Sequence, residues 1–113
     1  MKTVFLFPGQ GSQYIGMGKN LYNKLDYAKK KYNDACDILN YDIKEISFFD
    51  KKKLLNHTKY TQPAIFIYSI ILDYILKDNN ITPKGVAGHS LGEISALVSN
   101  KCLTFEIALN FIK

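Results

Sequence analysis

The sequence contains no arginine: its fifteen basic residues are all lysine, and the formal net charge is +5. Proteins that bind nucleic acids typically combine arginine with clustered basic faces. We therefore interpret the lysines, including the run at 29–31, as a solvated surface, and we predict no nucleic-acid partner. A positive surface still favours acidic or phosphorylated partners.

Cysteines are few, and a long apolar segment is missing. Cys36 and Cys102 form no C-x-x-C pair and no ligand cluster with the two histidines, so we predict no metal site and two buried, reduced thiols. Reduced thiols are typical of the cytoplasm. The apolar run at 64–76 is too short to span a bilayer, and the N-terminus lacks a signal-peptide pattern. We therefore expect a soluble, cytoplasmic protein that does not bind membranes.

Alternating strand and helix patterns predict an α/β fold over residues 1–113, with parallel strands joined by crossover helices. Residues 3–7 are apolar or β-branched without alternation, which is typical of a strand buried on both faces. A second short strand is expected around Val86. Apolar residues at helical spacing predict helices near residues 17–25, 26–39, 42–49, 63–77, 91–100 and 105–113.

Helix starts are indicated by capping residues and by proline. Thr61 or Gln62 is expected to cap the helix that has Pro63 in its first turn, where a missing N–H costs little. This helix is apolar almost all round and is therefore expected in the middle of the core. Thr104 is predicted to cap the last helix, and Leu97 is predicted to point inward.

Residues 88–92 have the sequence Gly-His-Ser-Leu-Gly, which is the G-x-S-x-G pattern of a nucleophile elbow. In such a turn the glycines let strand and helix approach closely while Ser90 projects its hydroxyl. The amides of Leu91 and Gly92, at the positive end of the helix, are expected to face an oxyanion. Ser90 is therefore a candidate nucleophile, although these five residues alone also fit an ordinary strand-to-helix connection.

A second glycine-rich loop, Pro-Gly-Gln-Gly-Ser-Gln at 8–13, follows the first strand directly. Its small residues allow the backbone to come close to a ligand. Neither of the glycine patterns that hold phosphates, G-x-x-x-x-G-K-[ST] and G-x-G-x-x-G, occurs here. His57, a lone histidine in a polar connection, is interpreted as a surface residue rather than a catalytic base.

The segments 7–13, 61–64 and 88–93, in this order and spacing, closely resemble the malonyl-CoA:acyl-carrier-protein transacylase family, whose acyltransferase domains act in fatty-acid and polyketide synthesis. The resemblance covers the whole chain but less than half of the family's length. It implies the N-terminal part of an α/β-hydrolase-like acyltransferase domain. It also implies a monomer without a permanently bound cofactor, which moves malonyl from malonyl-CoA to the phosphopantetheine thiol of acyl carrier protein in fatty-acid biosynthesis.

The resemblance assigns expected roles to single residues. Ser90 would carry the acyl group between two exchanges, and the backbone amides of Gln10 and Leu91 would form the oxyanion hole. Gln62 and His89 match motif positions near the substrate. His89 is a poor base for Ser90, because neighbouring side chains at an elbow point apart.

Two working residues of the family, a carboxylate-binding arginine and a base histidine, have no counterpart here. The stripe of the last helix runs to the final residue, and two strands are too little sheet for a self-sufficient domain. We therefore expect these residues to be part of a longer protein, and to be inactive or nearly so alone.

Two alternative functions stay open from the sequence. A serine thioesterase or another α/β-hydrolase shares the elbow, but hydrolases usually supply the second oxyanion amide from an HGGG-type loop, so the loop at 8–13 favours the transferase. A non-catalytic fragment that only binds a partner is the other possibility.

Overall fold

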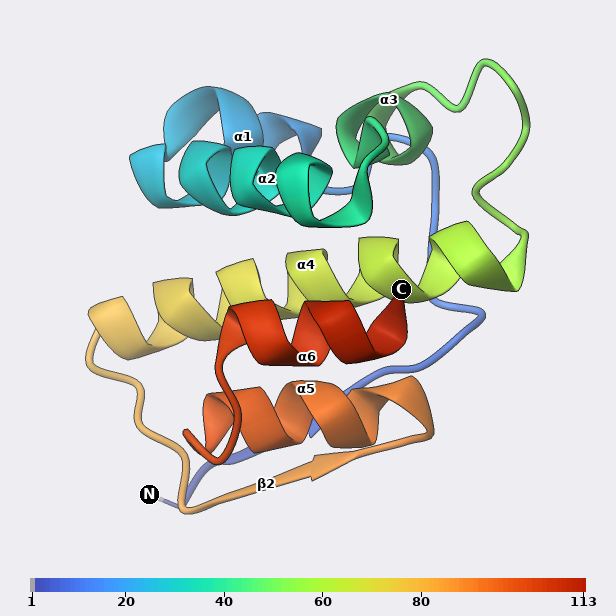
Figure 1. The fold of residues 1–113 in the computed structure, drawn as a ribbon. Coiled ribbons are helices and arrows are strands. Elements are labelled where there is room, and N and C mark those ends of the chain that lie inside the picture. Colours follow the sequence, from blue (N-terminus) through green and yellow to red (C-terminus); the bar gives the residue numbers. More distant parts are fainter. Residues whose placement is uncertain (1) are drawn as a thin grey trace.

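The computed structural model describes residues 2–113, which form two strands and six helices within that range. In chain order these are β1 (Val4–Phe7), α1 (Lys19–Lys24), α2 (Asp26–Leu39), α3 (Ile43–Phe48), α4 (Thr58–Asp78), β2 (Gly85–Gly88), α5 (Leu91–Ser99) and α6 (Phe105–Ile112). Helix α4 crosses the centre of the molecule, with α1, α2 and α3 on one side and α5 and β2 on the other (Figure 1).

The two strands pair in parallel, with Val4 opposite Gly85 and Phe7 opposite Gly88. The connection between them contains α1 to α4, so the predicted α/β fold with crossover helices is confirmed. Because both strands run in the same direction, their carboxyl ends lie together. The loop at 8–13 and the turn at 89–90 therefore leave the sheet at the same edge.

Helix α4 begins earlier than the sequence predicts. Its first residue is Thr58 and its N-cap is His57, so the prediction of a cap at Thr61 or Gln62 is wrong, and Pro63 lies inside the helix. The amides of Tyr60 and Thr61 already donate to the His57 carbonyl, at 2.8 and 2.9 Å. Proline is favoured in the first turn of a helix, but here these hydrogen bonds start the helix one turn before Pro63, so the prediction from the proline failed.

Other helix ends agree with the sequence. Helix α2 has the predicted bounds, and the Thr104 hydroxyl accepts a hydrogen bond from the Ile107 amide at the start of α6. Asp42 caps α3 by accepting from the amides of Lys44 and Glu45. A side-chain oxygen at this position satisfies helical N–H groups that have no carbonyl partner.

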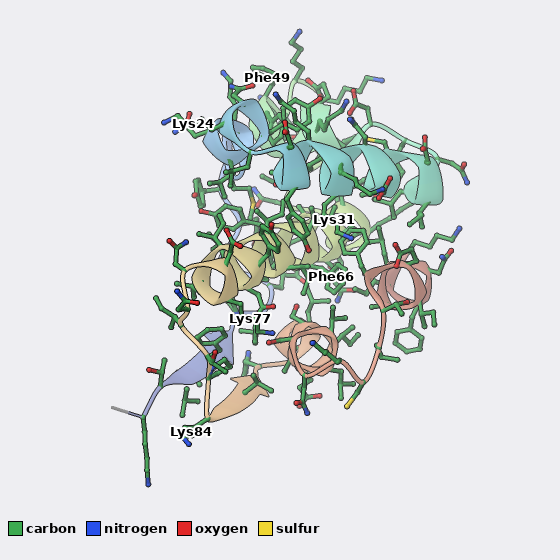
Figure 2. The ribbon with its side chains drawn as sticks, turned by 90° about the vertical axis from the view of Figure 1, so that its left-hand side faces the viewer. Lys24, Lys31, Phe49, Phe66, Lys77 and Lys84 are labelled. Carbon is green, nitrogen blue, oxygen red and sulfur yellow. The ribbon has the colours of Figure 1, made fainter. Side chains whose placement is uncertain are left out.

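The main core lies between α2, α3, α4 and α6, where Tyr32, Phe66 and Ile67 are completely buried. Phe66 stacks on Phe105 of α6 with a centroid distance of 5.4 Å. In Figure 2 Phe66 lies between the helices, whereas Lys24 projects from the surface. The first half of α4 is thus central to the core, as its composition predicts.

The strand region has a smaller core. Phe5, Phe7 and Ala96 form it, with Val86 packed against them. The side chains of Val4 and Leu6 are exposed, Leu6 by 78%, so the prediction that β1 is buried on both faces is wrong. Leu97 on α5 is also exposed rather than inward. An apolar run in the sequence shows that a strand is hydrophobic, but only the elements packed against the strand determine which of its faces is buried.

An ion pair within α4 is hydrogen-bonded to α5. The buried Asp73 carboxylate accepts from Lys77 Nζ at 3.0 Å and from Ser99 Oγ at 2.7 Å. Lys77 Nζ also donates to the Ser99 carbonyl at 2.7 Å. Because each charged group has several hydrogen-bonding partners, these bonds offset the free-energy cost of removing it from water.

The two cysteines are free, as expected, but they are not both buried. Cys36 is half-buried and Cys102 is exposed, so the prediction of two buried thiols is wrong. Burial raises the pKa of the Cys36 thiol. None of the helices within residues 2–113 has the length and apolarity to cross a membrane.

Candidate active site

Ser90 lies in the sharp turn between β2 and α5. Its φ of 56° and ψ of −115° are values that a side-chain-bearing residue adopts only under strain, at a cost of about 1–3 kcal/mol. The His89 amide donates to the Phe7 carbonyl at 3.1 Å, which continues the strand pairing up to the turn. Ser90 itself is exposed at the tip. This backbone has the geometry expected of a nucleophile elbow.

Both elbow glycines are required by close backbone contacts. A Cβ atom on Gly88 would lie 2.0 Å from the carbonyl carbon and oxygen of Gly92, and a Cβ on Gly92 would lie 2.0 Å from the Phe7 carbonyl oxygen. These are backbone atoms, which cannot rotate away as a flexible side chain can. The structure thus confirms why glycine is needed at both positions: the backbones of β2, α5 and β1 are in contact at the turn that contains Ser90.

The first loop lies directly against the elbow. A Cβ atom on Gly9 would lie 2.5 Å from the His89 carbonyl oxygen and 3.5 Å from Ser90 Cβ. The hydroxyl of Ser12 donates to the Gly9 carbonyl at 3.0 Å and closes the loop on itself. The structure therefore brings together two segments that are far apart in the sequence.

Two amides, one in the first loop and one directly after Ser90, are not used within the fold. Among the hydrogen bonds of residues 2–113, none uses the N–H of Gln10 or Leu91. The Gly92 amide, in contrast, donates to the His89 carbonyl at 3.0 Å, so the prediction that it faces an oxyanion is wrong. An N–H without a partner at the start of a helix is available to a developing negative charge.

The other predicted site residues differ in exposure and in hydrogen bonding. His89 is exposed, and Gln62 is half-buried on α4, one turn after Thr58. The Gln10 side chain bonds to the Thr58 hydroxyl, with Nε2 donating at 3.2 Å. No side chain within residues 2–113 hydrogen-bonds the Ser90 hydroxyl. His57 lies at the N-cap of α4 and makes no capping bond with its side chain.

Sequence reasoning missed the contacts between the first loop and the start of α4. The Gln13 side chain donates to Asn56 Oδ1 at 2.8 Å, and its Oε1 accepts from the Gly11 amide at 2.8 Å. Asn56 and Thr58 are exposed polar residues, which are common in any solvated connection, so the sequence alone does not distinguish them. No periodicity marks them, because a helix start and a loop 48 residues away meet only in three dimensions.

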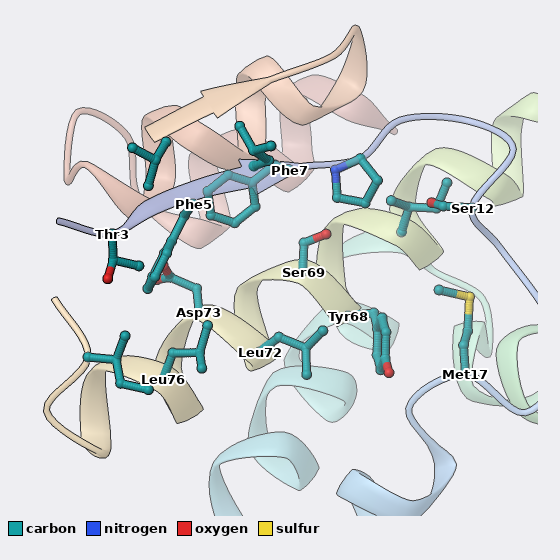
Figure 3. Close-up of a pocket in the computed structure, with 15 residues that line it drawn as sticks. Thr3, Phe5, Phe7, Ser12, Met17, Tyr68, Ser69, Leu72, Asp73 and Leu76 are labelled. Atoms are coloured by element: carbon teal, nitrogen blue, oxygen red, sulfur yellow. The ribbon is translucent and has the colours of Figure 1, made fainter. Parts of the chain in front are cut away.

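A groove of about 440 Å³ lies between β1 and α4 (Figure 3). Phe5 lines it from the strand, and Leu72 and Leu76 line it from α4. Ser12 lies at one end, near the first loop. Ser90 is not among the lining residues, so we do not assign this groove to the acyl group.

Raised pKa values occur at several half-buried tyrosines. Burial raises the pKa of Tyr27 and Tyr41 to about 12. A hydrogen bond with Tyr14, followed by burial, raises the pKa of Tyr68 to about 12; the two hydroxyl oxygens are 3.2 Å apart. Over the described part of the chain, no three His, Cys, Asp or Glu side chains are grouped to hold a metal ion.

Comparison with known proteins decides the family. The family model described as the acyl transferase domain matches residues 4–112. The chain belongs to the acyl transferase domain family. The malonyl CoA-acyl carrier protein transacylase of Staphylococcus aureus (strain MRSA252) is 42% identical over 99% of this chain and 36% of its own length. That of Bacillus subtilis (strain 168) is also 42% identical, over 99% of this chain and 35% of its own length.

Solved structures of this family have the same fold as the chain. The malonyl-CoA:ACP transacylase of Synechocystis sp. PCC 6803 gives a TM-score of 0.93 at 42% identity, over 100% of this chain and 38% of that one. The Clostridium perfringens enzyme gives 0.93 at 35% identity, over 99% and 35%. A malonyl-transacylase in complex with a type II PKS acyl-carrier protein gives 0.91 at 33% identity, over 99% and 37%. The chain thus spans about a third of the length of these acyl transferases.

Proposed function

We propose that this chain supplies the nucleophile and the oxyanion hole of a malonyl-CoA:acyl-carrier-protein transacylase in fatty-acid biosynthesis. The observation that carries the proposal is the strained Ser90, with the Gly9 backbone against it and unused amides on the neighbouring residues Gln10 and Leu91. Relatives that are 42% identical bear the name of this transacylase. These features support acyl transfer more strongly than the motif alone.

In the first half-reaction, Ser90 Oγ attacks the thioester carbonyl of malonyl-CoA. Its proton passes to a base, the carbonyl oxygen becomes an oxyanion, and the coenzyme A thiolate leaves as the malonyl ester forms. The Gln10 and Leu91 amides donate to the oxyanion. Loss of one such donor typically lowers the rate on the order of 100- to 1000-fold.

In the second half-reaction, the phosphopantetheine thiol of acyl carrier protein attacks the Ser90 ester, and the Ser90 hydroxyl is regenerated. Separating the exchanges means that two bulky thioesters never occupy the site together. The acyl carrier protein that is bound to a relative in a solved complex supports this choice of partner. Gln62 and His89 are proposed to line the path of the substrate rather than to transfer protons.

A base for Ser90 is proposed to come from outside these residues. His89 is the neighbour of Ser90, and neighbouring side chains at an elbow point apart. His57 lies at the N-cap of α4, and no side chain within residues 2–113 hydrogen-bonds the Ser90 hydroxyl. We therefore expect the 113 residues alone to remain unlabelled by radioactive malonyl-CoA. Stable label that depends on Ser90 would contradict this expectation.

The serine hydrolase alternative is not favoured, because the relatives are named transacylases and the first loop, not an HGGG-type loop, lies against the elbow. The names of the relatives and the intact elbow at Ser90 also favour a catalytic protein over the non-catalytic alternative. We further propose that the protein acts as a cytoplasmic monomer without a permanently bound cofactor; gel filtration tests the oligomeric state.

The test is a chimera in which this chain replaces the matching third of the Staphylococcus aureus transacylase. We expect transfer of radioactive malonyl to acyl carrier protein, and loss of transfer in Ser90→Ala. Circular dichroism confirms that both chimeras fold. Release of free malonate at the same rate without carrier protein would instead identify a hydrolase, and equal transfer by Ser90→Ala would exclude Ser90 as the nucleophile.

A further inference from the structure

We propose that Thr58 and Asn56 are positioning residues, which hold the first loop so that the Gln10 amide stays beside Ser90. The significance of that amide rests on the proposed function, in which it donates to the oxyanion. The anchoring itself concerns only the fold. Together with Gln10 and Gln13, these two residues form what we call the anchor cluster.

The anchor cluster joins the loop to the start of α4 by side-chain bonds at two points. Gln10 Nε2 donates to Thr58 Oγ1 at 3.2 Å. The Thr58 hydroxyl in turn donates to Gln10 Oε1 at 3.4 Å. Gln13 Nε2 donates to Asn56 Oδ1 at 2.8 Å. Both ends of the Gln13 amide are used, because its Oε1 accepts from the Gly11 amide at 2.8 Å. Through Gln13, the loop backbone is thereby connected to the residue that precedes the N-cap of α4.

Little else connects this part of the loop to another element. Within the described chain, the hydrogen bonds that leave residues 10–13 for another element are the ones to Asn56 and Thr58; the Ser12 bonds return to Gly9. Gly11 adopts a φ of 111°, with nothing within 4 Å of where a Cβ would be. A glycine in open space gives the backbone freedom that side-chain bonds must restrict.

The start of α4 does not use these polar groups for its own stability. Its N-cap, His57, makes no side-chain capping bond, and the Thr58 hydroxyl bonds to Gln10 instead. The N-cap residues of α3 and α6, in contrast, use their side chains for their own helices: Asp42 caps α3 and Thr104 caps α6. The polar side chains at the start of α4 are directed toward the loop, which is the arrangement expected of a positioning role.

The experiment is nuclear magnetic resonance on the Staphylococcus aureus chimera described above, with backbone order parameters for residues 9–13 and the nuclear Overhauser effect between the Gly9 α-protons and the Ser90 β-protons. In Thr58→Val we expect the order parameters at Gln10 and Gly11 to fall from about 0.85 to below about 0.6, and the Overhauser effect to weaken. Thr58→Ser, which retains the hydroxyl, should restore both.

Asn56 provides a second, independent pair of variants. Asn56→Ala should loosen Gln13 and Gly11, whereas Asn56→Asp keeps an acceptor oxygen and should not. Thr104→Val is the matched control: it removes a threonine hydroxyl at a helix start, so it should lower the melting temperature and leave the loop signals unchanged. Asn56 and Thr58 are both exposed, so their variants should fold.

Wild-type order parameters and an unchanged Overhauser effect in Thr58→Val and Asn56→Ala would overturn the proposal. So would equal loosening by Thr58→Ser, because that result would make the hydroxyl irrelevant. These signals require no turnover. An inactive chimera would therefore contradict the proposed function and leave the anchoring intact, whereas an active chimera with an unaltered loop in Thr58→Val would contradict the anchoring alone.

Discussion

The helical layer and the strand region of this protein obtain their structure in different ways. In the layer formed by α1 to α4 and α6, large side chains such as Tyr32 and Phe66 are completely buried. In the region formed by β1, β2 and α5, the buried cluster is small, and Leu6 is 78% exposed. There the elements are fixed by glycine backbones in direct contact. The candidate nucleophile lies in the second region, where backbone geometry rather than side-chain packing sets its position.

The largest effect is expected from a methyl group at the elbow. Gly92→Ala places a Cβ 2.0 Å from the Phe7 carbonyl oxygen, so β1 and α5 must separate. We expect the free energy of unfolding to fall by roughly 4 kcal/mol or more, measured by urea denaturation. Gly85→Ala is the control, because nothing lies within 4 Å of its Cβ position. Equal stability of the two variants would refute the contact-based account of the strand region.

A cavity in the helical layer should have the next largest effect. Ile67→Ala removes three carbons from a completely buried site and is expected to cost about 2–5 kcal/mol. Leu6→Ala in β1 removes as many carbons from an exposed side chain and should cost less than about 0.5 kcal/mol. Urea denaturation of both variants measures the difference. A cost at Leu6 close to that at Ile67 would show that the strand face is covered in solution.

The ion pair on α4 that is hydrogen-bonded to Ser99 of α5 should contribute a smaller amount. Asp73→Ala leaves Lys77 and the Ser99 hydroxyl without their buried carboxylate, and we expect a loss of about 1–3 kcal/mol. Asp34→Ala is the matched control, because it breaks the Lys30–Asp34 pair, which has the same spacing and is more exposed. That change should cost less than about 0.5 kcal/mol. Thermal melts of both variants test whether burial makes the difference.

The smallest effect is a loss of stability at high pH that originates in the helical layer. Burial raises the pKa of Tyr27 and Tyr41 from 10.0 to about 12 in the folded protein. As the pH rises from 10 to 12, the unfolded chain loses these protons first, so the free energy of unfolding falls. Below pH 10 both states keep the protons, and these residues cause no dependence. The double variant Tyr27→Phe, Tyr41→Phe should flatten the curve; an equally steep fall would exclude the two tyrosines as its cause.

The sequence anticipates local features well and tertiary ones poorly. It predicts the bounds of α2, the Thr104 cap and the glycine pattern around Ser90, because each depends on residues a few positions apart. It fails at the start of α4, at the exposed face of β1 and at the Gly92 amide, because these depend on bonds and neighbours that a linear pattern does not contain. The anchor cluster escaped prediction for the same reason. The roles of Ser90, Gln10, Leu91, Gln62 and His89 stay predictions.

Ser90 is the residue that is proposed to carry the acyl group. The direct measurement is acid quenching of the chimera after brief exposure to malonyl-CoA, followed by mass spectrometry of its peptides. We predict one malonyl group on the peptide that contains Ser90 and none in Ser90→Ala. Malonyl on a different residue, or transfer to carrier protein with Ser90 unmodified at every time point, would contradict the account.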